Sequence, residues 1–510
     1  MRQARVWLSI LFLAVLPLGA LHAASVDSPE RARFEAAACA FKDVPATWAV
    51  EQRVECGWLH VPESRGKPDS RMLRLWVAIA RADGPDRQAD PLLYIHGGPG
   101  YATVDYFFPY FPKSKTWAGL RESRDIVFFD QRGTGRSAPG FCKELGQTLE
   151  ALGRAAPPPR EELDQAKAAF AACRTKMLAD GFDYAAYNST TTVEDAEDLR
   201  RALGIARWNV YGISYGSLVG LEYLRLHPDS VRAAILDSLF PPNSPHGAEQ
   251  ITTTALGYQA LQRACDRDAA CHTHFPDILG SLARAIRQLD AEPLSRPDGG
   301  RITGGTLRDA LWFMLVGTKT APWVPLAVDR AAAGDEELIR KLASTFGGTG
   351  GFGDFSHGMA HAANCYEVSD GSTASSVRAA MQRYPYLASA GEVAEETDEL
   401  CAAWQTMHAP LSFHAPVRSA VPVLLYGGEF DPATPYDDAV LASRHLSNST
   451  LVLVPGASHA GMGVDDCTRG IAHAFLAAPA RSPDLACLQQ RPAVVFPTEG
   501  LVEFLKSMEG

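Results

Sequence analysis

The sequence places a serine in a setting that suits nucleophilic catalysis. Ser214 lies in the stretch Gly212-Ile213-Ser214-Tyr215-Gly216, which follows a β-branched and aromatic run and precedes a leucine-rich one. This spacing fits a tight strand–turn–helix connection, because small neighbours allow the two backbones to pass closely. A serine on such a turn projects its hydroxyl away from the sheet, so we expect Ser214 to be a nucleophile.

A nucleophilic serine needs a base and a group that orients the base. Asp431 follows a β run through two glycines in LLYGGEFDPATP, and His459 follows another β run in LVLVPGASHAG. The three residues occur in the order Ser214, Asp431, His459, with the last two only 28 residues apart. We therefore predict that His459 is the general base and that Asp431 holds its imidazole in the useful tautomer.

Acyl transfer also needs donors for the oxyanion. The stretch LLYIHGGPG ends a third β run in a glycine pair, whose backbone N–H groups are free of side-chain obstruction. We expect the oxyanion hole to be formed by Gly98, with Gly97 as the alternative, and by the N–H of Tyr215 directly after the nucleophile.

These residues must be positioned by a sheet, and alternating strand and helix patterns predict one that is mostly parallel. Open parallel sheets place their ligand sites at the carboxyl ends of the strands, where all three residues would lie. The expected strands are Leu73–Ala80, Leu92–Ile95, Ile126–Phe129, Trp208–Tyr211, Ala233–Leu236, Val421–Tyr426 and Leu451–Val454, with a helix at Glu194–Leu203 before the serine strand.

The middle of the chain has a different pattern. Amphipathic runs at Thr306–Leu315, Leu326–Ala333 and Val377–Arg383 predict helices, and no clear strand occurs among them. A helical cap inserted between two parts of one sheet is the simplest organisation. The expected segments are a signal peptide at 1–23, core at 24–240, cap insertion at 241–410 and core again at 411–510.

The N-terminus resembles a secretory signal. Arg2 and Arg5 precede an apolar run from Val6 to Leu21, which ends in small residues. That run is short for a membrane span, which needs roughly 20 residues. We therefore expect an exported protein, secreted or periplasmic, with no stable membrane insertion after the signal is removed.

Cysteine usage agrees with export. The chain has ten cysteines and no CxxC pair. An even number in an exported protein favours disulfides. Connectivity cannot be deduced from spacing, although consecutive pairing closes the shortest loops.

The overall charge excludes some classes of binding partner. The formal net charge is −11, and no basic patch interrupts it. An acidic surface is unsuited to nucleic acid and to anionic membranes. We expect a peptide or small ester as substrate and no nucleic-acid partner; the sequence does not predict an oligomeric state.

Five motifs together resemble one branch of a known family. HGGPG, FFDQRGTGRS, YGISYGS, GEFDPATP and GASHAG look like the prolyl-aminopeptidase and tripeptidyl-aminopeptidase branch of the α/β hydrolases. The resemblance implies an α/β-hydrolase fold with a helical cap, and serine hydrolysis of peptides from the N-terminus. The signal peptide and cysteines are more similar to the secreted tripeptidyl-type members.

One motif of that set contains a further acidic residue, Asp130, within DQRGTGRS. Asp130 precedes the serine, so we do not expect it to be the catalytic acid. We expect it to form a structural salt bridge with Arg132 that braces the oxyanion loop.

Substrate recognition has one candidate in the cap. Glu367 follows Cys365 in NCYEVSD and resembles a Cys-x-Glu/Asp position of secreted relatives. An aminopeptidase must hold a free α-amino group, for which a carboxylate is the natural partner. Glu367 is therefore either an amine-binding residue or an ordinary surface glutamate.

Metal ligands are not expected. His357 and His361 are four residues apart in HGMAH, but Gly358 stands where a metalloprotease has its glutamate. The predicted reaction needs no metal and no cofactor.

The sequence thus predicts an exported serine exopeptidase that acts through an acyl-enzyme. A carboxylesterase or lipase could use the same triad, because the fold does not fix the acyl donor. A binding protein that has lost the chemistry is the remaining possibility, against which the intact triad argues.

Overall fold

The structure is a computed structural model. It describes residues 32–508 except 42–43, 45–46, 109–113, 138–140, 245, 298, 347–354, 368–373, 388–398 and 405–407. The predicted signal segment at 1–23 lies outside the described residues.

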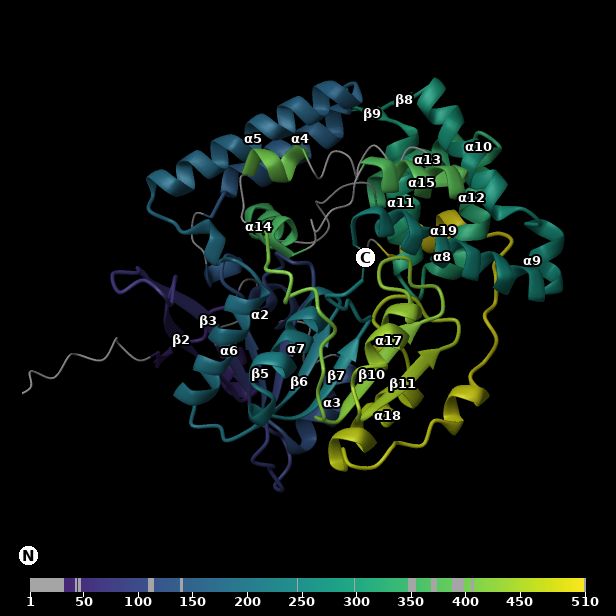
Figure 1. Ribbon diagram of the computed structural model, residues 1–510. Coiled ribbons are helices and arrows are strands. Elements are labelled where there is room, and N and C mark those ends of the chain that lie inside the picture. Colours follow the sequence, from purple (N-terminus) through teal and green to yellow (C-terminus); the bar gives the residue numbers. More distant parts are fainter. Residues whose placement is uncertain are drawn as a thin grey trace, which may run out of the picture. The chain divides into compact units, whose positions relative to one another are not determined.

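A nine-stranded sheet forms the core, with strands in the order β1-β2-β3-β5-β4-β6-β7-β10-β11 (Figure 1). Every pairing from β5 to β11 is parallel, whereas β1, β2 and β3 join antiparallel at one end. The parallel strands therefore deliver their carboxyl ends to one edge. The bounds are β1 (Arg33–Ala37), β2 (Val54–Pro62), β3 (Met72–Ala80), β4 (Leu92–Ile95), β5 (Ile126–Phe129), β6 (Trp208–Ile213), β7 (Val231–Asp237), β10 (Val423–Gly428) and β11 (Ser449–Val454).

The seven predicted strands all occur, and those at Leu92–Ile95 and Ile126–Phe129 have the predicted bounds. The predictions missed β1 and β2. β1 has mostly exposed residues, and its pairing with β2 joins segments that are distant in sequence. Local pattern carries little information on such an edge strand.

Side chains of successive strand residues enter two different apolar clusters, as the period of two requires. In β4, Leu93 and Ile95 belong to one cluster, and Leu92 and Tyr94 to the other. The first cluster also contains residues of α6 (Ser189–Ala202), α7 (Tyr215–Leu226) and α17 (Tyr436–Ser443). The second contains residues of α3 (Lys115–Ser123) and α18 (Asp466–Ala477). Helices thus cover both faces of the sheet.

Between β7 and β10 the described residues form mainly helices. Most of these insertion helices share a separate apolar cluster, in which Leu261, Leu282, Leu311 and Leu342 are fully buried. The exception is α14 (His357–Glu367), whose buried residues at 359, 362 and 363 belong to the first cluster of the sheet. A two-residue pairing of β8 (Leu294–Ser295) with β9 (Arg301–Ile302) interrupts the insertion helices. The helices are α8 (His246–Arg267), α9 (Ala269–His274), α10 (Ile278–Ala291), α11 (Gly304–Val316), α12 (Val324–Ala332), α13 (Glu336–Thr345), α14 (His357–Glu367) and α15 (Ala374–Arg383). The domain limits 241 and 410 remain a prediction.

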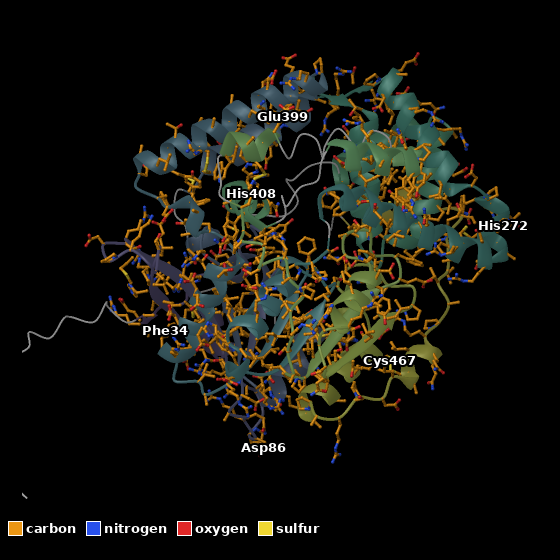
Figure 2. All side chains as sticks on the ribbon, viewed as in Figure 1. Phe34, Asp86, His272, Glu399, His408 and Cys467 are labelled. Atoms are coloured by element: carbon orange, nitrogen blue, oxygen red, sulfur yellow. A yellow bond between two sulfur atoms is a disulfide. The ribbon has the colours of Figure 1, made fainter. Side chains whose placement is uncertain are left out.

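Two helices from the first part of the chain lie beside α14 (Figure 1): α4 (Lys143–Ala155) and α5 (Pro159–Ala179). Glu399, which Figure 2 labels, lies 3.2 Å from the Arg160 guanidinium and 2.8 Å from the Lys167 ammonium, both on α5. Helices that precede Ser214 in sequence (α4 and α5) and the residue Glu399, which follows it, therefore lie together near α14.

All ten cysteines are paired, each with the next along the chain. The pairs are Cys39–Cys56, Cys142–Cys173, Cys265–Cys271, Cys365–Cys401 and Cys467–Cys487, the last of which begins at α18 (Figure 2). The expectation of disulfides with consecutive pairing is confirmed. Across the described ranges, no helix combines the length and the apolar character needed to cross a membrane.

Candidate active site

Ser214 occupies the turn between β6 and α7. Its backbone has φ 55° and ψ −127°, a conformation that non-glycine residues rarely adopt. A Cβ at Gly212 would lie 2.2 Å from the Gly216 carbonyl oxygen, and one at Gly216 would lie 2.1 Å from that of Ile95. Both glycines are therefore required by the close approach of backbones, as predicted from the spacing.

His459 and Asp431 meet at the carboxyl edge of the sheet. The Nδ1 atom of His459 lies 2.8 Å from Oδ2 of Asp431. The other carboxylate oxygen accepts the N–H groups of Ala433, at 2.9 Å, and Thr434, at 3.0 Å. The Thr434 hydroxyl donates to Oδ2 at 2.9 Å. The carboxylate is thus held in one orientation, and its bond to Nδ1 leaves Nε2 of His459 to accept a proton.

The electrostatics of this pair suit a general base. Burial by itself favours a neutral imidazole, but the charge and hydrogen bond of Asp431 outweigh it and raise the pKa of His459 above its ordinary value. Asp237 adds to this increase. Burial also opposes ionisation of Asp431, yet His459 and the loop N–H groups lower the pKa of that carboxyl. Asp431 therefore carries the negative charge that an imidazolium would need.

Asp237, at the end of β7, connects the serine turn to the histidine loop. Its backbone carbonyl accepts the Ser214 N–H at 2.9 Å. Its fully buried carboxylate accepts the N–H of Gly461 at 2.8 Å and that of Met462 at 3.0 Å. Asp237 therefore fixes the backbone of the predicted nucleophile and the backbone just after the predicted base. Sequence reasoning missed this role, because an aspartate at a strand end has many uses and the backbone N–H groups that its carboxylate binds are over 200 residues away.

The predicted oxyanion loop lies against the serine. A Cβ at Gly97 would lie 2.7 Å from the Ser214 Cβ and 3.2 Å from its Oγ, so only a glycine leaves the hydroxyl room. Gly98 has φ +119°, and the Gln131 amide donates to the His96 carbonyl at 2.9 Å. Tyr215 is the first residue of α7, where backbone N–H groups have no acceptor within the helix. The predicted donors are thus on the two segments that flank Ser214.

The prediction of a salt bridge between Asp130 and Arg132 is wrong. Arg132 binds the Asp195 carboxylate through two nitrogens, at 2.6 and 2.7 Å, and both side chains are fully buried. Asp130 instead accepts the N–H groups of Val104, at 2.8 Å, and Arg136, at 3.1 Å. A guanidinium can donate two parallel hydrogen bonds to one carboxylate, and Arg132 makes both of them to Asp195. Asp130 therefore has other partners, although it is close to Arg132 in sequence. Burial raises the pKa of Asp130 to about 7.

Glu367 is not a surface residue. It lies at the end of α14 with 2% of its surface exposed, and one carboxylate oxygen accepts the Ser189 N–H at the start of α6. The phenol of Tyr215 lies near this carboxyl without a close hydrogen bond to it. Burial raises the pKa of Glu367 to about 7, although the Ser189 N–H lowers it. The structure therefore places Glu367 beside the residue that follows Ser214.

A histidine and two cysteines also come together near α14. Ligand atoms of His361, Cys365 and Cys401 lie within 4.8 Å of one another, but the two sulfur atoms form a disulfide. Burial lowers the pKa of His361 to about 4, and its ring packs on Phe170 with centroids 3.9 Å apart. His361 is therefore a neutral residue of an apolar environment in this oxidised state.

Comparison with known proteins finds related hydrolases and peptidases. A family model described as alpha/beta hydrolase fold matches residues 90–301, and one described as TAP-like protein matches residues 384–487. A tripeptidyl aminopeptidase of Streptomyces lividans is 27% identical over 85% of this chain and 84% of its own length. The serine protease Hip1 of Mycobacterium tuberculosis is 27% identical over 78% of this chain and 80% of its own. A proline iminopeptidase of Aeromonas sobria is 26% identical over 48% of this chain and 49% of its own.

Among solved structures, a proline iminopeptidase of Mycobacterium smegmatis aligns with 83% of this chain and 98% of its own, at 17% identity and a TM-score of 0.36. The sheet topology and the family models confirm the predicted α/β-hydrolase fold. Fold and matches together define a serine hydrolase. The chain has the α/β-hydrolase fold, and its two family matches are consistent with the TAP-like branch of that fold family.

Proposed function

We propose that this chain is an exported serine exopeptidase that releases short fragments from the free N-terminus of peptides. The observation that carries the proposal is the arrangement at the carboxyl edge of the sheet: Ser214 on a strained turn, and His459 hydrogen-bonded to a buried Asp431. The names of the relatives support a peptide substrate, since two of them are called aminopeptidase and iminopeptidase.

In this mechanism the Ser214 hydroxyl attacks the scissile carbonyl carbon while Nε2 of His459 takes its proton. The backbone N–H groups of Tyr215 and of Gly98 donate to the oxyanion that forms. His459 then protonates the leaving amine, the C–N bond breaks, and the N-terminal fragment remains as an ester on Ser214. Water, deprotonated by the same histidine, hydrolyses this ester, and the proton returns to the serine.

Glu367 would recognise the substrate's α-ammonium group. Its support is a buried carboxyl beside Tyr215, adjacent in sequence to the nucleophile. A buried carboxyl with a raised pKa gains a compensating charge when an ammonium group binds, which favours the ionised form. The distance from this carboxyl to the scissile bond would then set how many residues are released.

The five disulfides support export, because such bonds persist in oxidising compartments. The stretch at 1–23, which resembles a signal peptide, is a second support, from the sequence. Export is tested by N-terminal sequencing of the mature protein from a culture that expresses the full chain; an N-terminus at Ala24 or Ser25 is expected, and an intact Met1 would contradict it.

The activity is tested by mass spectrometry of the products from a mixed peptide library. We expect N-terminal fragments of constant short length from free peptides, and no cleavage of the same peptides after N-terminal acetylation. Ser214→Ala is the matched inactive control. Turnover of activated esters without any peptide cleavage would instead favour a carboxylesterase or lipase, and cleavage of acetylated peptides would contradict an exopeptidase.

A further inference from the structure

The C-terminal end of insertion helix α11 is bonded directly to the histidine loop. The N–H of His459 donates to the Val316 carbonyl at 3.1 Å, and the Ser458 hydroxyl donates to the Leu315 carbonyl at 2.6 Å. In the turn after α11, the Thr318 hydroxyl accepts the Ser458 N–H at 2.9 Å. Three hydrogen bonds therefore join Ser458 and His459 to the end of α11 and to the turn after it, about 140 residues earlier in sequence.

A second insertion helix, α8, packs on the loop that carries Asp431. A Cβ at Gly257 would lie 2.8 Å from Cα of Pro432 and 3.1 Å from the Phe430 carbonyl oxygen. The Phe430 side chain is fully buried in the apolar cluster of the insertion helices. The last residue of α8, Arg267, lies 2.9 Å from the Glu429 carboxylate. The residues on both sides of Asp431 are thus held by α8.

We propose that α8 and α11 position the acid–base pair, with Gly257 and Thr318 as the positioning residues. This inference rests on the proposed roles of Asp431 and His459, and it goes beyond them by giving helices of the insertion a part in catalysis as well as in substrate choice. Strand β10 leads into the loop that carries Asp431, and β11 leads into the loop that carries His459. Helix α8 contacts the first loop, and the end of α11 is bonded to the second.

The physical reason is that proton transfer is sensitive to small displacements. Misplacement of a catalytic group by ~1 Å can cost ~10²-fold in rate. The Thr318 hydroxyl holds a backbone N–H next to the base, so its loss lets the His459 loop shift without removing any group that touches the substrate. A methyl group at Gly257 would push directly on backbone atoms of the acid loop, which cannot rotate away.

The first test compares Thr318→Val, which removes the hydroxyl at nearly constant volume, with Thr318→Ser, which retains it. Hydrolysis of a small activated ester without an amine is the assay, so the outcome does not depend on how peptides are recognised. We expect kcat for Thr318→Val to fall about tenfold with KM little changed, since the base and not the binding of substrate is affected. Thr318→Ser should restore most of the rate.

Matched controls separate positioning from stability. Thr345→Val alters a hydroxyl of α13 that has no hydrogen-bond partner among the described residues, and should leave kcat unchanged. Gly257→Ala should reduce kcat, whereas Gly470→Ala in α18, where a Cβ meets nothing within 4 Å, should not. Thermal unfolding midpoints of all variants confirm that each is folded.

The results of these assays separate a failure of this inference from a failure of the proposed function. An active wild type with unchanged kcat in Thr318→Val and Gly257→Ala would overturn this inference alone. A fall in kcat that Thr318→Ser fails to restore would mean that the hydroxyl is not what holds the loop, and would also overturn it. A wild-type chain without any ester turnover would overturn the proposed function, and this inference with it.

Discussion

His459 and Asp431 are joined by a hydrogen bond of 2.8 Å between Nδ1 and Oδ2, and Asp431 is buried with three further donors on its carboxylate. The satisfied carboxylate cannot turn away from the ring. The proposed mechanism therefore depends on one fixed tautomer of His459, with the proton on Nδ1 and the lone pair on Nε2.

Asp431→Asn should reduce kcat by about 10³- to 10⁴-fold on peptides and esters alike, because an amide can hold the ring in the wrong tautomer and gives an imidazolium no counter-charge. Steady-state kinetics on both substrates measure the effect. Asp466→Asn, at an exposed aspartate in the first turn of α18, is the matched control and should be neutral. A loss of less than tenfold would show that Asp431 does not orient the base.

On the acid side, kcat/KM should fall with a midpoint above ~6.5, the ordinary pKa of a histidine. Asp431 raises the pKa of His459, so the imidazole is still protonated at a pH where a free histidine would be neutral. Activity is present above the raised pKa and is lost as the pH falls through it. A pH profile on an ester without ionisable groups measures this fall; a midpoint below ~6 would contradict the assignment of His459 as base.

Glu367→Gln should raise KM for free-amine peptides by about 10- to 100-fold with little change in kcat, the effect of losing a charge-assisted hydrogen bond of ~1.5–3 kcal/mol. Since the pKa of Glu367 is raised to about 7, KM of the wild type should fall as the pH rises through that value and the carboxylate forms. Ester hydrolysis should be unaffected, and Glu336→Gln at an exposed position of α13 is the control.

The competing explanation for Glu367 is a purely structural carboxyl that holds Ser189. In that case Glu367→Gln would change peptide and ester kinetics equally, or lower the unfolding midpoint alone. N-terminal acetylation of the peptide should mimic the substitution, and the two losses should not add. Additive losses would place the amine site elsewhere.

The disulfides make unequal contributions to stability. Cys365–Cys401 spans 36 residues of sequence and Cys265–Cys271 only 6. Loop-closure entropy predicts that replacing the first pair by serines costs about 1.5 kcal/mol more free energy of unfolding than replacing the second. Denaturant titration measures the difference, and equal or reversed costs would mean that native packing, not loop size, decides. The denatured wild type should expose no free thiol before reduction.

Sequence reasoning recovered those parts of the structure that local pattern encodes. The glycines around Ser214 and the continuous apolar run of β10 each have a short-range cause, so the turn and the strands could be predicted. The order of Asp431 and His459 after their strands then placed both at one edge of the sheet.

The contacts that sequence reasoning missed are long-range. Asp237 binds the N–H groups at 461 and 462, and Thr318 binds that of Ser458. Nothing near Asp237 or Thr318 in sequence marks these partners, because their meeting depends on how the sheet closes and how α11 ends. The partner of Arg132 was mispredicted for the same reason: an aspartate two residues away was preferred to one on α6.

Covalent labelling tests directly whether Ser214 is the nucleophile. The full chain is incubated with a fluorophosphonate, digested and mapped by mass spectrometry, with Ser214→Ala as a folded control of matched unfolding midpoint. We expect one phosphonyl adduct, on Ser214, and none on the variant. An unlabelled wild type, or an adduct on another serine that persists in Ser214→Ala, would contradict it.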